Sequence, residues 1–310
     1  MSQPSKLDVL DSRLSSDDAD KFLNDLRKQQ EQKQDYWKFE IVPNYFKQSD
    51  LATDETTFNY LNEHFGRVKS WENVFENLDK LNEAADSDVC YKVFFLARHG
   101  QGYHNLAHDK YGNDAWNDYW SKINGDGEIV WGPDPELTEL GQNQAKENYK
   151  QWQVELKHGC RLPTRWFVSP LSRSIDTLTI TWENITKLEE ARPLIKENIR
   201  ETIGVHTCDK RSTRSIIDSK YSPKGYIIEP GFAEEDVYFK KDYRETVREH
   251  AMRINEFFQE IFTLKDNVIC VTSHSGSIRA SLLVLGHRQF SVGTGGMIPV
   301  FVKGTKIVNK

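Results

Sequence analysis

Three short apolar runs in this sequence are each followed directly by polar side chains that can bind or transfer an anion. The runs cover residues 93–97, 166–168 and 268–271. They lead into Arg98-His99-Gly100, Ser169-Pro170-Leu171-Ser172-Arg173 and Ser273-His274-Ser275-Gly276. Continuous apolar runs of this length are typical of strands buried on both faces of a parallel sheet. Because ligands bind such sheets at the carboxyl ends of the strands, we expect the three polar segments to meet in one site.

Convergence of these segments would place two arginines and two histidines in one pocket. Crowded positive charges are costly unless an anion joins them, and guanidinium groups bind the oxygens of a tetrahedral phosphate in a bidentate manner. Gly100 and Gly276 would let backbone N–H groups approach that phosphate, and a helix opening near Ser275 would add its positive dipole end. The residue types therefore predict a site for a small phosphorylated substrate.

The segments between the apolar runs have the periodicity of helices. Apolar residues recur at helical spacing within 137–156, 171–188, 234–262 and 278–285. Nearer the N-terminus, residues 74–81 have the same spacing, and Ser15-Ser16-Asp17-Asp18 is typical of the cap of an amphipathic helix. Strands that alternate with helices predict an α/β fold with a largely parallel sheet.

Composition excludes several other classes of protein. The 310 residues are 37% hydrophobic, enough for a sizeable core, and no run approaches the roughly 18 apolar residues that span a bilayer. The net charge of −6 argues against nucleic acid as the main partner. Four cysteines without metal-type spacing, and a polar N-terminus without a signal-type stretch, favour a reducing compartment: the cytoplasm, with the nucleus as an alternative. We expect no membrane partner, and the oligomeric state stays open.

Five motifs together resemble those of the histidine phosphatase (phosphoglycerate-mutase-like) superfamily, in the order of that family. They are Arg98-His99-Gly100 with Asn105, Leu137-Thr138-Glu139-Leu140-Gly141-Gln142-Asn143-Gln144-Ala145, Ser169-Pro170-Leu171-Ser172-Arg173, Ile199-Arg200-Glu201 and Ser273-His274-Ser275-Gly276. The N-terminal extension and the segment 201–209 look most like the fungal phosphomutase-homologue branch. The resemblance implies a three-layer α/β/α fold with a largely parallel central sheet. It also implies an N-terminal extension over 1–88 and a histidine phosphatase domain over 89–310.

The resemblance also assigns roles to particular residues. His99 is expected to be the nucleophile that attacks phosphorus. Arg98, Arg173 and His274 are expected to bind the non-bridging oxygens. Asn105 would add a neutral donor to this phosphate site, and Glu201 would protonate the leaving group and then activate water. The arginines supply the charge that Mg²⁺ supplies elsewhere, so neither a metal nor a cofactor is expected.

The reaction implied is hydrolysis of a phosphomonoester, with two alternatives. A phosphoglycerate-type mutase shares the first half of the mechanism, but here Arg98-His99-Gly100 is followed by Gln101-Gly102-Tyr103 and not by the Glu-Ser or Gln-Ser of glycolytic mutases. Their E-R-x-Y-G acid segment also has no counterpart in this sequence. The second alternative is a non-catalytic binding module on the same fold. Both histidines and both arginines are present, which favours an enzyme over such a module.

Several other residues permit two interpretations. Glu197 and His206 could share or replace the role of Glu201, or serve as an ion-pair partner and a loop residue. The pair His104 and His108 could bind a metal, although a packing role is favoured because no third ligand is near in the sequence. Three further groups could contribute to substrate binding or only to the surface and core. They are the basic run Lys210, Arg211 and Arg214, the tryptophans 116, 120, 131 and 152, and the insertions 102–136 and 205–235.

Overall fold

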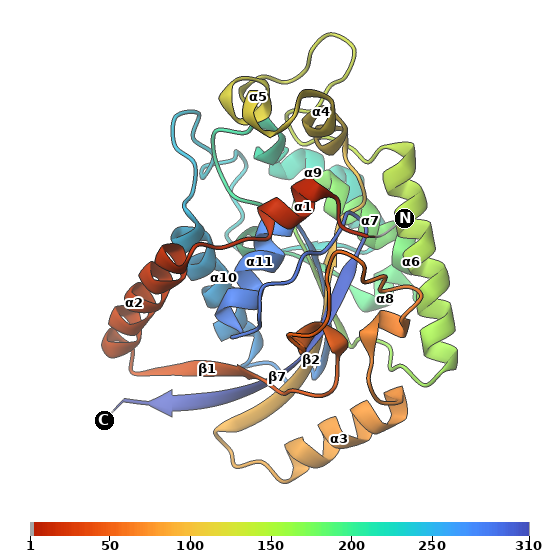
Figure 1. The fold of residues 1–310 in the computed structure, drawn as a ribbon, viewed down its shortest axis with the longest axis vertical. Coiled ribbons are helices and arrows are strands. Elements are labelled where there is room, and N and C mark those ends of the chain that lie inside the picture. Colours follow the sequence, from red (N-terminus) through yellow and green to blue (C-terminus); the bar gives the residue numbers. More distant parts are fainter. Residues whose placement is uncertain (1–2, 310) are drawn as a thin grey trace.

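The computed structural model describes residues 3–309, which form a seven-stranded sheet with helices on both faces (Figure 1). The strand order is β1-β7-β2-β6-β3-β4-β5. The strands are β1 (Asp35–Ile41), β2 (Val89–Arg98), β3 (Arg165–Val168), β4 (Leu194–Ile195), β5 (Ile227–Ile228), β6 (Val268–Ser273) and β7 (Met297–Val308). β2, β6, β3, β4 and β5 run parallel, whereas β7 is antiparallel to both β2 and β1. The predicted α/β class with a largely parallel sheet is therefore confirmed.

Alternating side chains of β2 show how helices cover the two faces of the sheet. The Phe94 ring packs edge-on against Phe258 of α10 (Val247–Ile261), with centroids 5.4 Å apart. The neighbouring Phe95 packs on the opposite face against Trp152 of α6 (Glu139–Lys157), with centroids 4.7 Å apart. Because Phe94 and Phe95 are both fully buried, β2 is covered on both faces, as its apolar sequence requires. The three layers of the predicted α/β/α fold follow.

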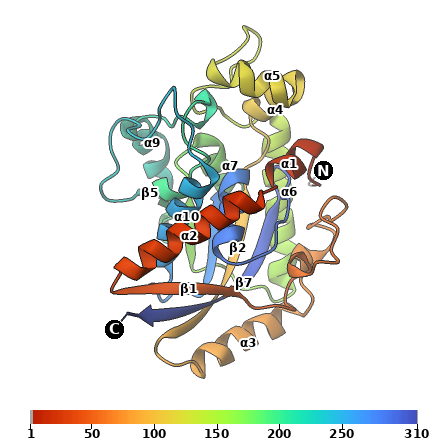
Figure 2. The same ribbon diagram turned by 60° about the vertical axis from the view of Figure 1, so that its left-hand side comes forward.

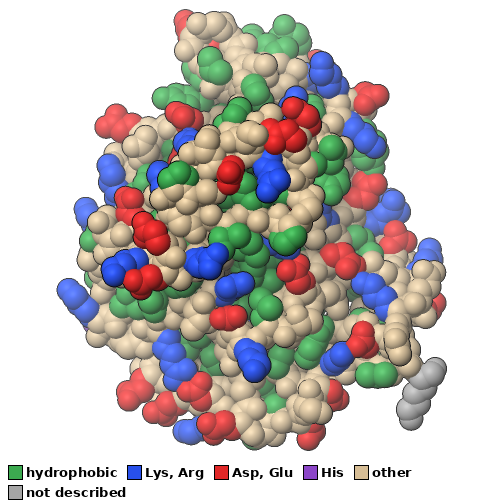
Figure 3. All heavy atoms as spheres, turned by 180° about the vertical axis from the view of Figure 1, so that it is seen from behind, with side chains coloured by type: hydrophobic (Ala, Val, Ile, Leu, Met, Phe, Trp, Pro, Cys, Tyr) green, Lys and Arg blue, Asp and Glu red, His purple; other side chains and the backbone are tan. Residues whose placement is uncertain are grey.

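The other helices complete these layers and the upper part of the molecule. They are α1 (Lys6–Asp11), α2 (Ser16–Gln32), α3 (Trp71–Glu83), α4 (Tyr103–Tyr111), α5 (Asn113–Asp118), α7 (Ser172–Trp182), α8 (Leu188–Ala191), α9 (Arg214–Tyr221) and α11 (Ser275–Val284). α2 lies beside α10, as Figure 2 shows, and α4 and α5 form a cap at the top of the molecule. On the face opposite Figure 1, acidic and basic side chains are interspersed (Figure 3). None of the described helices is long and apolar enough to cross a membrane.

Helix boundaries agree with the sequence where a capping residue is present. Ser15 caps α2 by accepting from the N–H of Asp18, and Thr138 caps α6 by accepting from the N–H of Gly141. The helix expected over 234–262 is wrong in its first half, because α10 begins only after Thr246, whose side chain closes a capping box. The helix expected over 171–188 ends at Trp182, and the short α8 follows after a break.

The N-terminal extension contributes to every layer of the fold. β1 pairs with β7 at the edge of the sheet, and α2 and α3 cover opposite faces. Lys33, which caps the end of α2, reaches Glu256 of α10 with a 2.9 Å ion pair. In α3, the Trp71 ring lies 5.9 Å from that of Phe95. The extension thus packs on the core, while the domain boundary at 88/89 stays a prediction.

Candidate active site

The carboxyl ends of β2 and β6 bring the predicted site residues together. These strands pair in parallel with Arg98 opposite Ser273, so His99 and His274 follow at the same edge of the sheet. Their ring centroids lie 5.0 Å apart. Arg173, in the first turn of α7, donates a 3.3 Å hydrogen bond from Nε to Nε2 of His99. The three polar segments therefore converge in the structure.

The imidazole of His99 is held in one tautomer. Its Nδ1 lies 2.6 Å from the carbonyl oxygen of Gly100, so Nδ1 carries the proton and donates it there. Nε2 keeps its lone pair and accepts from Arg173. Burial, together with the charges of Arg173 and Arg98, holds the pKa of His99 well below its usual value. His99 is thus a neutral imidazole at neutral pH, with its lone pair facing a guanidinium.

His274 uses its ring differently. Nε2 lies 2.7 Å from Oγ of Ser169 and 3.3 Å from Oγ of Ser174. Nδ1 is buried and has no hydrogen-bond partner among the described residues. Burial, together with the charge of Arg173, holds the pKa of His274 well below its usual value. Buried polar atoms almost always have a hydrogen-bond partner, so we expect a ligand oxygen to bind Nδ1 of His274.

Arg173 is positioned by the start of α7 and by a loop carboxylate. The buried Asp134 accepts from the backbone N–H of Ser172 at 2.7 Å and from its hydroxyl at 2.9 Å, which satisfies the first turn of the helix. The guanidinium of Arg173 donates to the carbonyl of Cys208 at 2.8 Å and to Oδ1 of Asp209 at 3.0 Å. Arg173 is fully buried, so its charge is balanced inside the protein.

Two carboxylates of the chain itself neutralise the two site arginines. Oδ1 of Asp8, in α1, lies 2.5 Å from Nη1 of Arg98. Asp209 pairs with Arg173 and, at 3.2 Å, with Arg244. The anion expected from the crowding of positive charge is therefore supplied here by protein side chains. Neither aspartate was predicted, because each is far in sequence from its arginine and stands in no motif that marks it.

The expectation that Gly100 and Gly276 offer free N–H groups to a phosphate is wrong for this structure. The N–H of Gly100 donates to Oγ1 of Thr177 at 3.0 Å, and that of Gly276 donates to Glu201 at 3.1 Å. Glycine is needed at both positions for close packing. A Cβ atom on Gly100 would overlap the backbone of Gly141, and one on Gly276 would overlap the Glu201 carboxylate.

Glu201 lies where the first turn of α11 meets the segment that follows β4. Its Oε1 accepts from the N–H of Thr202 at 2.7 Å, and its Oε2 accepts from the hydroxyl of Ser275 and the N–H of Gly276. Burial, together with the charges of Asp209 and Asp11, raises the pKa of Glu201 despite these hydrogen bonds. Its carboxyl group therefore holds a proton to higher pH than an ordinary glutamate.

A cavity of about 730 Å³ opens beside this cluster. Several residues considered from the sequence line this cavity: Arg98, Asn105, Glu201, His206, His104, His108 and Trp116. His99, Arg173 and His274 are at most 2% exposed and are not among its lining residues. The cavity thus approaches the predicted phosphate site without reaching all of it.

His104, for which the sequence favours a packing role, lies beside the site histidines. It lines the cavity and its ring centroid lies 5.4 Å from that of His99. Its Nδ1 is buried without a hydrogen-bond partner among residues 3–309. Burial and the charge of Arg173 hold the pKa of His104 well below its usual value. The spacing of His104 from His108 does not predict this position, because the ring that His104 approaches is that of His99.

Glu197 and the basic run take structural roles outside the cavity. Both carboxylate oxygens of Glu197 are used, one by Arg200 at 3.0 Å and the other by Arg211 at 2.6 Å. Arg211 is buried and bound to Glu197, so it neither lies on the surface nor binds a substrate anion, and both expectations are wrong for it. Lys210 and Arg214 are exposed. Glu197 is therefore a poor candidate for the proton donor.

The tryptophans pack in the core and in the cap. Trp152 belongs to the main core. Trp116 and Trp131 form a second buried cluster with Ala107 and Cys208, and Trp120 packs against it. The insertion 102–136 thus folds as a cap with its own small core, as a packing role predicts. Cys208 links this cap to the loop that carries Asp209.

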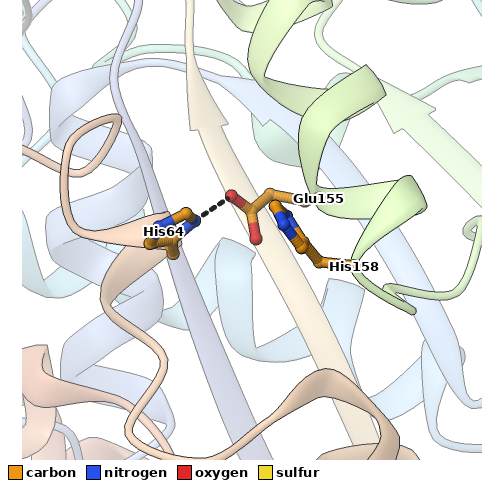
Figure 4. Close-up of side chains that lie close together, drawn as sticks. All are labelled: His64, Glu155 and His158. Carbon is orange, nitrogen blue, oxygen red and sulfur yellow. Dashed lines mark hydrogen bonds and ion pairs between the residues drawn. The ribbon is translucent and has the colours of Figure 1, made fainter.

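Two groups of side chains among the described residues have the spacing of metal ligands. In the first, His64, Glu155 and His158 lie together away from the cavity (Figure 4). The buried Glu155 already accepts from the indole of Trp71 at 2.7 Å and contacts His64 at 2.8 Å, so it anchors α3 to α6. Gln151 adds a third hydrogen bond to the same carboxylate. These contacts account for the buried carboxylate.

The second group lies in the cavity wall and consists of His206, Cys208 and Asp209. Asp209 spends one oxygen on Arg173 and the other on Arg244. Burial raises the pKa of the Cys208 thiol well above its usual value, so the thiol stays protonated. A metal would have to displace two arginines and a proton. This donor set does not fit a metal ion.

Comparison with known proteins identifies the family. The model of the histidine phosphatase superfamily (branch 1) matches residues 94–292. The chain belongs to the histidine phosphatase superfamily. The match includes His99, Arg173 and His274, which the structure brings together, and Glu201, which lines the cavity.

Fungal proteins are among its relatives. The chain is 40% identical over 285 residues to a protein of Arthroderma benhamiae named probable phosphoglycerate mutase, covering 86% of this chain and 84% of that protein. It is 36% identical over 269 residues to phosphomutase-like protein 3 of Candida albicans, covering 86% and 80%. A solved mycobacterial glucosyl-3-phosphoglycerate phosphatase is 18% identical with a TM-score of 0.41, covering 68% of this chain and 90% of that chain. The resemblance to fungal phosphomutase homologues is confirmed.

Proposed function

We propose that this protein is a metal-independent phosphomonoester hydrolase that acts through a phosphohistidine on His99. The state of the His99 ring carries the proposal. Its proton is fixed on Nδ1 by Gly100, its lone pair is on Nε2, and its lowered pKa keeps it neutral. A neutral ring nitrogen is the nucleophile that attack on a phosphoryl group requires, and its lone pair becomes available when phosphate takes the hydrogen bond that Arg173 now donates to it.

In the first step, Nε2 of His99 attacks phosphorus and the bond from phosphorus to the leaving oxygen breaks. Glu201 donates its proton to that oxygen, which departs as an alcohol. Arg98, Arg173 and His274 hold the three non-bridging oxygens, on which the negative charge is spread. Nδ1 of His274 is buried and has no hydrogen-bond partner within residues 3–309, which supports this role. Asn105 lines the cavity and adds a neutral donor.

In the second step, water attacks the phosphohistidine. Glu201, now a carboxylate, accepts one proton of that water, and the bond from phosphorus to nitrogen breaks. The electron pair returns to Nε2 of His99, inorganic phosphate leaves, and Glu201 is protonated for the next cycle. Each proton and electron pair is thus restored within the site.

Metal independence is part of the proposal. The charge that stabilises the transferred phosphoryl group comes from Arg98 and Arg173. The metal-like set in the cavity wall has its carboxylate taken by two arginines and its thiol protonated. Binding of Mg²⁺ needs several free oxygen ligands, which this set does not offer.

A test compares the wild-type protein with His99→Ala and with His158→Ala, a matched control whose side chain is exposed and lies away from the cavity. In EDTA, we expect phosphate release from monoesters by the wild type and by the control, and loss of at least about 10³-fold in His99→Ala. A trapped phosphate label should survive base and be lost in acid, as a phosphorus–nitrogen bond requires.

Isomerisation of 3-phosphoglycerate, followed beside phosphate release, separates hydrolysis from the mutase alternative. Mutase turnover that exceeds phosphate release would contradict the hydrolase assignment. Turnover by His99→Ala, or dependence on a divalent ion, would contradict the covalent or the metal-free mechanism. Tight phosphate binding without any turnover would favour the binding-module alternative.

A further inference from the structure

The short helix α1 forms part of the wall of the cavity. Figures 1 and 2 show it above the carboxyl ends of the central strands, beside the cap formed by α4 and α5. Leu7, Asp8, Leu10 and Asp11 of α1 line the cavity, as does Ser5, which caps the helix. None of the residues of α1 is fully buried. The helix is therefore held by polar contacts at its edges and not by a core of its own.

Two ion pairs hold α1 over the site. Asp8 contacts Arg98 at 2.5 Å, and Asp11 contacts Arg279 of α11 at 3.4 Å. Asp8 is 12% exposed and Arg98 is 4% exposed, so the first pair is shielded from water. Although burial opposes it, the Arg98 guanidinium holds the pKa of Asp8 below its usual value. Asp8 is thus a carboxylate bound to Arg98 at neutral pH.

This carboxylate takes the contact that a phosphate needs. Arg98 is one of the two arginines assigned to phosphate, and its Nη1 is used by Asp8 and by the carbonyl of Val292. His99 and Arg173 lie outside the cavity lining while α1 is in place. A phosphate dianion brought into this arrangement would meet the carboxylates of Asp8 and Asp11. Like charges at such distances repel, so phosphate and docked α1 oppose each other.

We propose that α1 is an autoinhibitory lid whose Asp8 competes with substrate phosphate for Arg98. The inference rests on the proposed function, because it needs Arg98 to be a phosphate ligand. Substrate binding exchanges the single charge of Asp8 for the dianionic phosphate and releases α1. Residues 12–15 are the hinge of this lid. They stay in place because Arg13 forms an ion pair with Glu55 and the Leu14 carbonyl accepts a hydrogen bond from Gln289. Beyond them α2 stays packed on α10.

The decisive measurement is calorimetric titration of the full chain with inorganic phosphate. We expect Asp8→Asn and Asp8→Ala to bind phosphate about tenfold more tightly than the wild type, because a buried charge-assisted contact no longer has to be broken. The Michaelis constant for a phosphomonoester should fall by a similar factor. Asp17→Asn is the matched control, since Asp17 is exposed on α2 and pairs only with the exposed Lys21.

The outcomes separate the lid from the proposed hydrolase. Unchanged or weaker phosphate binding in both Asp8 variants overturns the lid, and weaker binding would show that Asp8 orients Arg98. Hydrolysis by the wild type with an unchanged Michaelis constant in the variants overturns the lid and leaves the hydrolase standing. Tighter phosphate binding without turnover in any protein supports the lid and rejects the hydrolase. Absence of phosphate binding in every protein rejects both.

Discussion

At the scale of single residues, the two site histidines use opposite ring nitrogens. His99 donates from Nδ1 to Gly100 and accepts from Arg173 at Nε2, whereas His274 contacts Ser169 through Nε2 and its Nδ1 has no partner among the described residues. The two rings lie 5.0 Å apart between centroids. His99 therefore has its lone pair on Nε2, whereas His274 has Nδ1 available to a phosphate oxygen. The similar positions of the two histidines after their strands do not predict this difference.

Glu201 carries the first residue-scale prediction. Glu201→Gln should slow hydrolysis of alkyl phosphates by about 10²-fold or more, the typical contribution of a general acid. Aryl phosphates, whose leaving groups need little help from a proton, should lose much less in the phosphorylation step. Because the pKa of Glu201 is raised, the wild type should keep its acid to higher pH and lose activity as pH rises through that pKa. Rapid-mixing measurements of phenol and alcohol release across pH check both expectations.

The same profile has an acid limb set by His99. Protonation of its ring stops attack, and the lowered pKa places this loss well below the usual value for histidine. Glu201→Gln should remove the alkaline limb and leave the acid limb. Equal losses for alkyl and aryl substrates would show that the proton donor is another residue. His206, which lines the cavity, would be the next to test, since Glu197 is committed to two arginines.

The residues at strand ends could be predicted from sequence because the apolar run and the polar segment are contiguous. His99, Arg173 and His274 were found in this way. Asp8 and Asp209 could not be, because their partners are set by tertiary packing over separations of 90 and 36 residues. A carboxylate that pairs with a distant arginine has the same local sequence as one that faces water.

At the scale of elements, the start of α7 is held by a carboxylate from a different loop. Asp134→Ala leaves the N–H of Ser172 without its buried acceptor, and we expect a loss of about 1–2 kcal/mol in the free energy of unfolding. Because Arg173 is the next residue, its guanidinium should shift and the Michaelis constant for a phosphomonoester should rise by about tenfold. Urea unfolding and steady-state kinetics measure the two effects.

Asp134→Asn is the matched control for this prediction. Its amide oxygen can still accept from the Ser172 N–H, so it should keep most of the stability and of the substrate affinity. A loss of stability in Asp134→Ala with an unchanged Michaelis constant would show that Asp134 supports the fold without positioning Arg173.

Elements with a local signal were predicted and those without one were not. α2 and α6 have a capping residue followed by periodic apolar residues, and both begin where the cap places them. β4 and β5 have two residues each, too few to show a pattern, and exist because neighbouring strands supply their hydrogen bonds. The first half of the expected 234–262 helix is wrong, because the capping box of Thr246 sets the start of α10 and the carbonyls of 233–235 in the preceding loop accept from Arg211.

At the scale of the whole molecule, the net charge of −6 conceals a positive centre whose charge is balanced from within. Arg98 and Arg173 belong to the ends of the parallel strands and the helix that follows, and their counter-charges come from the N-terminal extension and from the insertion 205–235. The extension and the insertion are the parts that the motif pattern left undefined. Segments added to the sheet therefore form part of the cavity wall, whereas the residues proposed for the chemistry follow the strands of the sheet.

The last prediction concerns stability against acid. His99, His250 and His274 are buried and His104 is half-buried, and loss of solvation holds the pKa of each ring well below its usual value. In the unfolded chain these rings bind protons near pH 6.5, whereas in the folded chain they do not. Below pH 6.5 the unfolded state therefore binds more protons, and each ring lowers the free energy of unfolding by up to about 1.4 kcal/mol per pH unit.

Carboxyl groups with raised pKa values act in the opposite direction over part of this range. Burial raises the pKa of Glu201, Asp109 and Asp176, so folding favours their protonated forms as pH falls. We expect the four histidines to dominate between pH 6.5 and pH 5, and the melting temperature to fall steadily over that interval. His250→Gln should flatten the fall, since His250 is buried beside the Thr202 and Ser277 hydroxyls and carries no proposed catalytic role. Calorimetric scans at pH 7.5, 6.5, 5.8 and 5.0 measure the melting temperatures of the wild type and of His250→Gln. A melting temperature that stays constant to pH 5 would show that these rings are protonated in the folded protein, and a positively charged His99 could not attack phosphorus at neutral pH. An equal slope in the variant would show that His250 does not contribute to the fall.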